Sequence, residues 1–157
     1  MGETIPRYAT QSLIQVLEET FDNHHGIFLD RGTSLFATLD QTSAEEASRL
    51  ASSSCASVAQ HVKHVAFYLD VMRRYLAGEE LGQIDWRAIW HESPNVTGAE
   101  WDALRADVRA RYTDLRNRLP EETAWSDPLQ FDTPLAVAMH TAAHLGAIRQ
   151  TLRMLRD

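Results

Sequence analysis

Apolar residues recur every three or four positions along four long segments of this chain, and this spacing restricts the fold more than any other feature. Because an α-helix has 3.6 residues per turn, such spacing gathers the apolar side chains on one face, whereas a half-buried strand needs strict alternation. The segments are residues 9–22, 56–77, 98–119 and 134–157. No stretch predicts a strand. The sequence therefore predicts an all-α protein, in which four amphipathic helices form a four-helix bundle.

Local signals mark the ends of the predicted helices. In a capping box, a Ser or Thr precedes a Glu by three positions, and two such boxes predict the start of a short helix and of the third long helix. These boxes are Ser43 with Glu46 and Thr97 with Glu100. Gly78 and Pro120 are expected to stop the second and third long helices. Thr133 followed by Pro134 predicts the cap and first residue of the last helix.

The connection between the second and third long helices, residues 79–95, is the longest irregular segment. It contains Trp86 and Trp90, and aromatic residues in a connection usually pack onto the bundle and bury area. The chain has no internal repeat, low-complexity tract or interdomain linker. We therefore expect one domain, residues 1–157, with a long crossover between helices two and three.

The strongest chemical signal is a pair of histidines, His140 and His144, in the last helix. Residues four positions apart lie on one face of a helix, and two imidazoles so placed can chelate one metal ion. An open metal site of the zinc type needs a third ligand, and the second helix offers His61 or His64. Apolar periodicity alone favours His61, which lies nearer the centre of the apolar stripe. Imidazole ligands suit zinc or nickel, but hydrogen-bonded core histidines that hold no metal would give the same pattern.

The sequence does not support a zinc protease, a nucleic-acid-binding protein or a membrane-spanning protein. Zinc proteases carry a glutamate directly after the first histidine of the helical pair, where this chain has Thr141. The net charge of −7 argues against nucleic-acid binding, and no apolar run is long enough to span a membrane. The single cysteine, Cys55, allows no intrachain disulfide and is expected to be a small, semi-buried residue. The first residues lack the regions of a signal peptide, so the cytoplasm is the expected compartment.

Two segments together resemble the DinB/YfiT-like superfamily: residues 57–65, SVAQHVKHV, and residues 140–149, HTAAHLGAIR. The resemblance implies a four-helix bundle of up-down-down-up topology, with a metal site of one histidine from the second helix and two from the last. In the family, the second-helix ligand falls about two turns after the helix start and just before an apolar residue. By resemblance the ligands are therefore His64, His140 and His144, with His61 as the alternative for the first. Ala147 departs from the pattern, because many members carry glutamine there.

The resemblance also implies a chemistry. Some members are thiol-dependent transferases that use small thiols such as mycothiol or bacillithiol, and others are described as metal-dependent hydrolases. We therefore expect a divalent metal ion that activates a thiol or water against a small electrophilic substrate. Homodimers are common in the family, so a homodimer is expected, without a nucleic-acid or membrane partner. The alternative is a non-catalytic dimeric bundle for binding or scaffolding, in which the histidines hold no metal.

Overall fold

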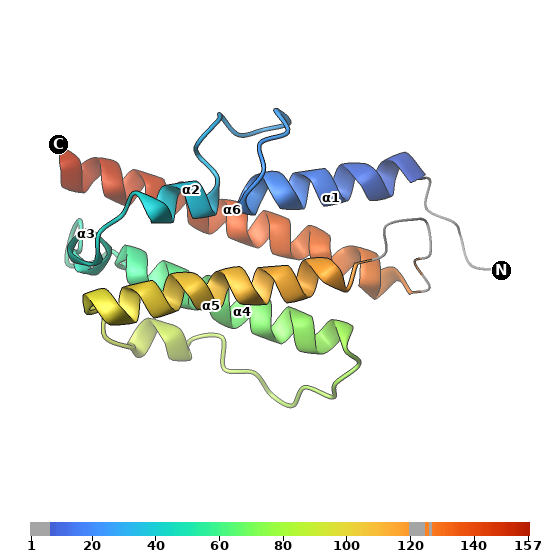
Figure 1. The fold of residues 1–157 in the computed structure, drawn as a ribbon. Coiled ribbons are helices and arrows are strands. Elements are labelled where there is room, and N and C mark those ends of the chain that lie inside the picture. Colours follow the sequence, from blue (N-terminus) through green and yellow to red (C-terminus); the bar gives the residue numbers. More distant parts are fainter. Residues whose placement is uncertain (1–6, 120–124, 126) are drawn as a thin grey trace.

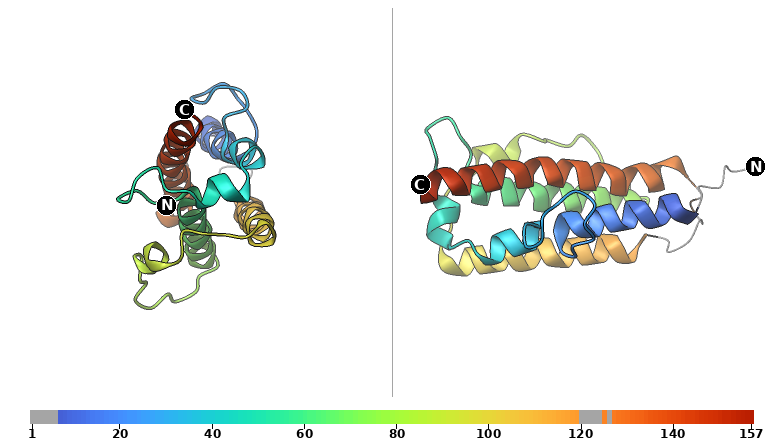
Figure 2. Two further views of the ribbon diagram at one scale, coloured as in Figure 1. Left: turned by 90° about the vertical axis from the view of Figure 1, so that its left-hand side faces the viewer. Right: turned by 90° about the horizontal axis from the view of Figure 1, so that it is seen from above.

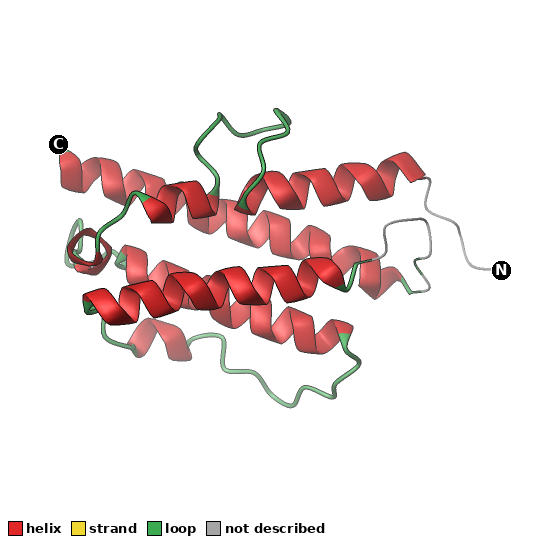
Figure 3. Cartoon of the chain, in the orientation of Figure 1, coloured by secondary structure: helices red, strands yellow, loops and turns green. Residues whose placement is uncertain are grey.

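The computed structural model describes residues 7–119, 125 and 127–157, and every regular element among them is helical (Figure 3). The elements are α1 (Arg7–Phe21), α2 (Leu35–Asp40), α3 (Ala44–Ser48), α4 (Val58–Leu76), the 3₁₀ helix η1 (Ala88–His91), α5 (Gly98–Asn117) and α6 (Pro128–Arg156). The all-α prediction is thus confirmed. Pro120, and residues 1–6, which carry the compartment prediction, lie outside the described residues. Within the described residues, no helix combines the length and apolar character needed to cross a membrane.

The long helices α1, α4, α5 and α6 lie side by side (Figure 1). The helices α1 and α6 run in one direction, and α4 and α5 run in the other. The helix α4 packs against both α5 and α6, and α6 packs against α1 as well. Residues 77–97 connect α4 to α5 by running back along the outside of the bundle (Figure 2). This return segment carries η1, which packs against α4.

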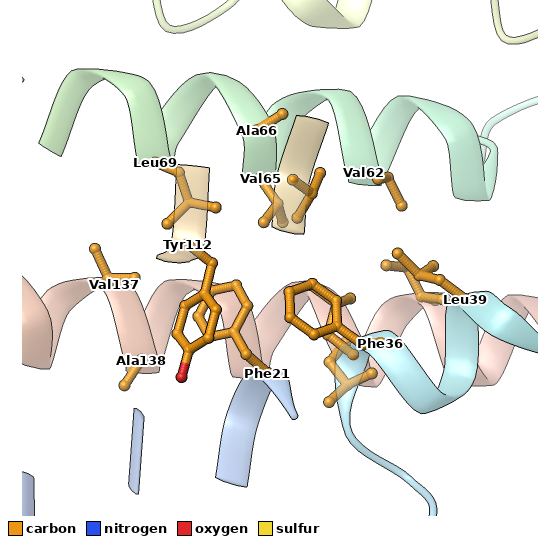
Figure 4. Packing of buried hydrophobic residues seen from close by; sticks show 14 of the residues in the cluster. Phe21, Phe36, Leu39, Val62, Val65, Ala66, Leu69, Tyr112, Val137 and Ala138 are labelled. Carbon is orange, nitrogen blue, oxygen red and sulfur yellow. The ribbon is translucent and has the colours of Figure 1, made fainter. Parts of the chain in front are cut away.

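An aromatic cluster fills the centre of the bundle (Figure 4). The ring of Phe21 from α1 stacks on Tyr112 from α5 with 4.3 Å between ring centroids, and Phe36 from α2 meets Tyr112 edge-on at 5.6 Å. From α4, Val65 and Leu69 are fully buried beside these rings. A large apolar side chain buried in this way stabilises the fold by roughly 1.5–3 kcal/mol. The core therefore consists of contacts between helices that lie far apart in the sequence.

The buried face of α4 differs from the predicted stripe. Apolar spacing predicts a buried stripe of Val58, His61, Val65, Tyr68, Met72, Tyr75 and Leu76. Tyr75 in that stripe is 47% exposed, whereas Val62 and Leu69, outside it, are fully buried. The reason is that α4 contacts α5 on one side and α6 on another, so it buries a wider face than a single stripe. The most buried face of α4 therefore includes His64, which is only 7% exposed, whereas His61 is half-buried. His64 is therefore more buried than His61, although periodicity places His61 nearer the centre of the stripe, and the choice of ligand between the two stays a prediction.

The start of α6 is a second correction. The structure begins this helix at Pro128, with the side chain of Asp127 accepting a hydrogen bond from the N–H of Leu129. Thr133 and Pro134, predicted as the cap and first residue, lie inside the helix. An acidic or hydroxyl residue followed by proline is a helix-start signal wherever it occurs, and this chain has two in close succession. The bounds of α1, α4 and α5, by contrast, fall close to the predicted ones.

A buried carboxylate organises the connection between α1 and α2. Glu19 is 1% exposed, and its two oxygens accept hydrogen bonds from the backbone N–H groups of four residues. These residues are His25, Ile27, Phe28 and Leu29. Burial alone would raise the pKa of Glu19, but the four N–H donors outweigh it and lower the pKa to about 2. The loop that follows α1 is thus wrapped around one negative charge.

Candidate metal centre

Three histidines meet between α4 and α6, at the place where these helices pack against each other. His64 comes from α4, and His140 and His144 come from successive turns of α6. Each offers a nitrogen atom that could bind a metal, and the three atoms lie within 4.8 Å of one another. The structure therefore brings together the three residues that the sequence proposes as ligands.

The spacing of two of these nitrogens suits a metal ion. The Nε2 atoms of His64 and His140 are 3.2 Å apart. Two nitrogens that each lie about 2.0–2.1 Å from one tetrahedral ion would be roughly 3.3 Å apart. An ion of the size of zinc therefore fits between these rings with little movement of either.

His61 occupies a different position, outside this cluster of three. Its Nδ1 lies 2.9 Å from the Nδ1 of His144, which is the length of a hydrogen bond between two imidazoles. That bond uses the Nδ1 atom of His144 and leaves the Nε2 atom of the same ring uninvolved in it. His61 is thus placed to fix the orientation of the His144 ring, a role that neighbours of metal-binding histidines commonly have.

Aromatic rings enclose the histidines. The ring of Tyr68 stacks on His140 with 3.8 Å between centroids, and Trp90 stacks on His64 at 4.6 Å. Trp90 also meets His61 edge-on at 5.5 Å. Because Trp90 belongs to η1, the return segment between α4 and α5 covers the site. The sequence predicted that the tryptophans of this segment pack onto the bundle, but it did not indicate that Trp90 packs on the histidines.

The histidines are held in the neutral form. Burial, with a smaller contribution from neighbouring histidines, lowers the pKa of His140 to about 4 and that of His144 to about 3. Burial likewise lowers the pKa values of His61 and His64. Neutral imidazole has the free lone pair that a metal requires. A bound divalent ion would then keep its full positive charge, since the cluster of three contains no carboxylate.

The protein alone does not satisfy all polar atoms of the site. The Nδ1 atoms of His64 and His140 and the Oγ1 of Thr141 are buried without a hydrogen-bond partner among the described residues. A buried polar atom without a partner costs roughly 1–3 kcal/mol. An ion held by the Nε2 atoms would not satisfy these Nδ1 atoms, so the fit to a metal rests on the donor set and its spacing: three imidazole nitrogens within 4.8 Å of one another.

The remaining histidines and the cysteine lie elsewhere. His24, His25 and His91 are exposed, and the ring of His25 pairs with Glu18 at 2.9 Å. Cys55 is exposed, so the expectation of a semi-buried residue is wrong. It lies in the turn that precedes the cap of α4, where no other element covers it.

The fold and the site together define the class of this protein. It is a helical bundle with a candidate metal site, formed by three histidines on two neighbouring helices. A sequence model of the DinB superfamily matches residues 29–148, so the chain belongs to that superfamily. The match confirms the resemblance and includes all four histidines of the site region. Comparison with curated proteins and comparison with solved structures each find no match.

Proposed function

We propose that this protein is a metal-dependent enzyme, in which His64, His140 and His144 hold a divalent ion. One observation supports this most directly: three neutral imidazoles with ligand atoms within 4.8 Å of one another, in a cluster without a carboxylate. Three protein ligands are typical of catalytic sites, which keep one position open, whereas structural zinc sites have four. Zinc or nickel suits the imidazole ligands best.

The bound ion would lower the pKa of a thiol or water that takes the open position, and so generate a nucleophile at neutral pH. The chain's own residues then have distinct roles. His61 keeps the ring of His144 in place through the bond between their Nδ1 atoms. Trp90 and Tyr68 limit the access of water by stacking on two of the ligand rings.

The reaction we propose is the attack of that thiol or water on a small electrophile, as in a thiol-dependent transferase or a hydrolase. Membership of the DinB superfamily and the histidine cluster support a metal-binding protein. The small-molecule substrate, the low-molecular-weight thiol, the homodimer and the cytoplasmic location stay predictions from the sequence.

Metal analysis of protein purified without an affinity tag tests the proposal. We expect about one zinc or nickel ion per chain, lost in a His140→Ala/His144→Ala variant. The matched control is His24→Ala/His91→Ala, which removes two exposed histidines and should keep the metal. Wild-type protein that stays metal-free after incubation with zinc, nickel and manganese would contradict the proposal and favour the non-catalytic bundle. Metal-loaded protein can then be assayed with a small thiol and a set of electrophiles.

A further inference from the structure

A pocket lies on another side of α6 from the histidine cluster, between the C-terminal half of α6, α2 and the loop that precedes α2. Its volume is about 160 Å³. Figures 1 and 2 show α2 beside this end of α6. Arg149, the arginine of the pocket nearest to the metal centre, follows His144 by five residues, which corresponds to a rotation of roughly 140° around the helix axis. The pocket is therefore separate from the histidine site.

Three arginines line this pocket: Arg149, Arg153 and Arg156. They recur at intervals of four and three residues, so their side chains leave the same face of α6. No Asp or Glu is among the lining residues. This concentration of positive charge stands out in a chain whose net charge is −7.

Two arginines of the pocket differ from those of α4 and α5, each of which forms an ion pair with a carboxylate. Among the described residues, Arg149 and Arg153 have no such partner, although Arg149 is half-buried. Arg156 is held by Glu46, a residue that does not line the pocket. The carboxylate of Glu46 accepts a hydrogen bond from the Nε of Arg156 at 2.8 Å. Two guanidinium groups therefore remain available to an anion, beside a third that is fixed in place.

The other polar groups of the wall suit an anion as well. Thr38 and Gln41, from α2 and its C-terminal end, line the pocket opposite the arginines. The hydroxyl of Thr38 has no partner among the described residues and can donate to an oxygen. Gln41 accepts from Arg156 through its backbone carbonyl at 3.1 Å, which leaves its side-chain amide free to donate.

We propose that this pocket binds the phosphate group of a small molecule, either inorganic phosphate or a phosphate monoester. Guanidinium groups bind phosphate oxygens through two parallel hydrogen bonds, and several arginines can share the oxygens of one phosphate. A volume of 160 Å³ corresponds to roughly five water molecules at about 30 Å³ each, enough for a phosphate group with a short stem. A larger ligand, such as a nucleotide, would extend out of the pocket. This inference does not depend on the metal centre.

Calorimetric titration of the full-length protein with inorganic phosphate tests the proposal. We expect binding that weakens at least about tenfold in an Arg149→Gln/Arg153→Gln variant, since both lost groups bind as charged donors. The matched control is Arg49→Gln/Arg87→Gln, which removes the same charge at two exposed positions outside the pocket and should change the affinity less than about twofold. Circular dichroism verifies that the variants are folded, and Thr38→Val, which keeps every charge, should also weaken binding.

Two results would overturn the proposal. One is the absence of phosphate binding by the wild type at roughly 10 mM, a concentration at which even a weak specific site is occupied. The other is an equal loss in the control variant, which would mean that only the overall charge attracts phosphate. Titration with glycerol phosphate distinguishes the sources: retained binding assigns a monoester, and lost binding assigns the free ion. Phosphate binding should persist in His140→Ala/His144→Ala, and its loss there would place the phosphate at the metal centre instead.

Discussion

Replacing Glu19 by glutamine should lower the free energy of unfolding by about 3 kcal/mol at pH 7. The change keeps the shape of the side chain but removes its charge and replaces one acceptor oxygen by an NH₂ group. Four backbone N–H groups point at this carboxylate, so the new NH₂ group would face donors. The loop after α1 would then lose the charge around which it is wrapped.

The magnitude follows from the pKa of Glu19. In the folded state the pKa is about 2, against an ordinary value of 4.5. One pKa unit corresponds to about 1.4 kcal/mol, so a lowering of this size stabilises the folded protein by roughly 3 kcal/mol when the carboxyl is charged. Because the folded pKa is the lower one, this stabilisation is complete above the unfolded pKa. It is lost as the pH falls from about 4.5 towards 2.

Urea denaturation at pH 7 and at pH 3 measures the effect. The difference between wild type and Glu19→Gln should shrink by about 2 kcal/mol between these two pH values. Glu80→Gln is the matched control, since Glu80 is exposed in a connection and should change stability by less than about 0.5 kcal/mol. A cost under about 1 kcal/mol for Glu19→Gln at pH 7, or a difference that stays constant with pH, would mean that the charge of Glu19 does not stabilise the loop.

Three further predictions concern the site and its scaffold. His61→Phe should weaken metal binding by about 10–100-fold in a competition titration without abolishing it, because the ring of His144 loses its hydrogen bond. Ser57→Ala should lower the free energy of unfolding by about 1 kcal/mol in urea denaturation, because the side chain caps α4. Trp101→Phe should lower it by about 2 kcal/mol, because the Nε1–H of this buried residue donates to the carbonyl of Thr42 at 2.8 Å.

The helices could be predicted from local chemistry. Both predicted capping boxes are present, with Ser43 and Thr97 accepting from the N–H groups of Glu46 and Glu100. The left-handed φ of 75° at Gly78 just after α4 explains why that helix stops there. The start of α6 was predicted wrongly, since local signals at Asp127 and Thr133 have the same chemistry. The helix begins at the first signal and continues through the second.

The candidate site could be predicted only in part. The pair His140 and His144 is visible in sequence because a helix sets its geometry. Choosing His64 over His61 required the resemblance, because burial of α4 depends on two partner helices that periodicity does not reveal. The contact of Trp90 with His64 arises from the path of the return segment, and no pattern in the sequence marks it. The role of Glu19 could not be predicted from the sequence, because its partners are backbone N–H groups of the following loop, which any residue type except proline would supply.

One helix, α6, carries residues of both proposed sites, and its sequence explains how the two sites stay apart. Residues 133–148 contain no Asp, Glu, Lys or Arg. The two α6 histidines lie in this uncharged stretch, where burial keeps them neutral, and the arginines begin directly after it at Arg149. Cations near a helix C-terminus are favoured by the helix dipole, so the last turn of α6 accommodates Arg153 without a carboxylate partner. One helix can therefore hold both proposed sites. Its uncharged segment packs against the rest of the bundle and supplies the neutral histidines, and its C-terminal part carries the arginines that could bind an anion.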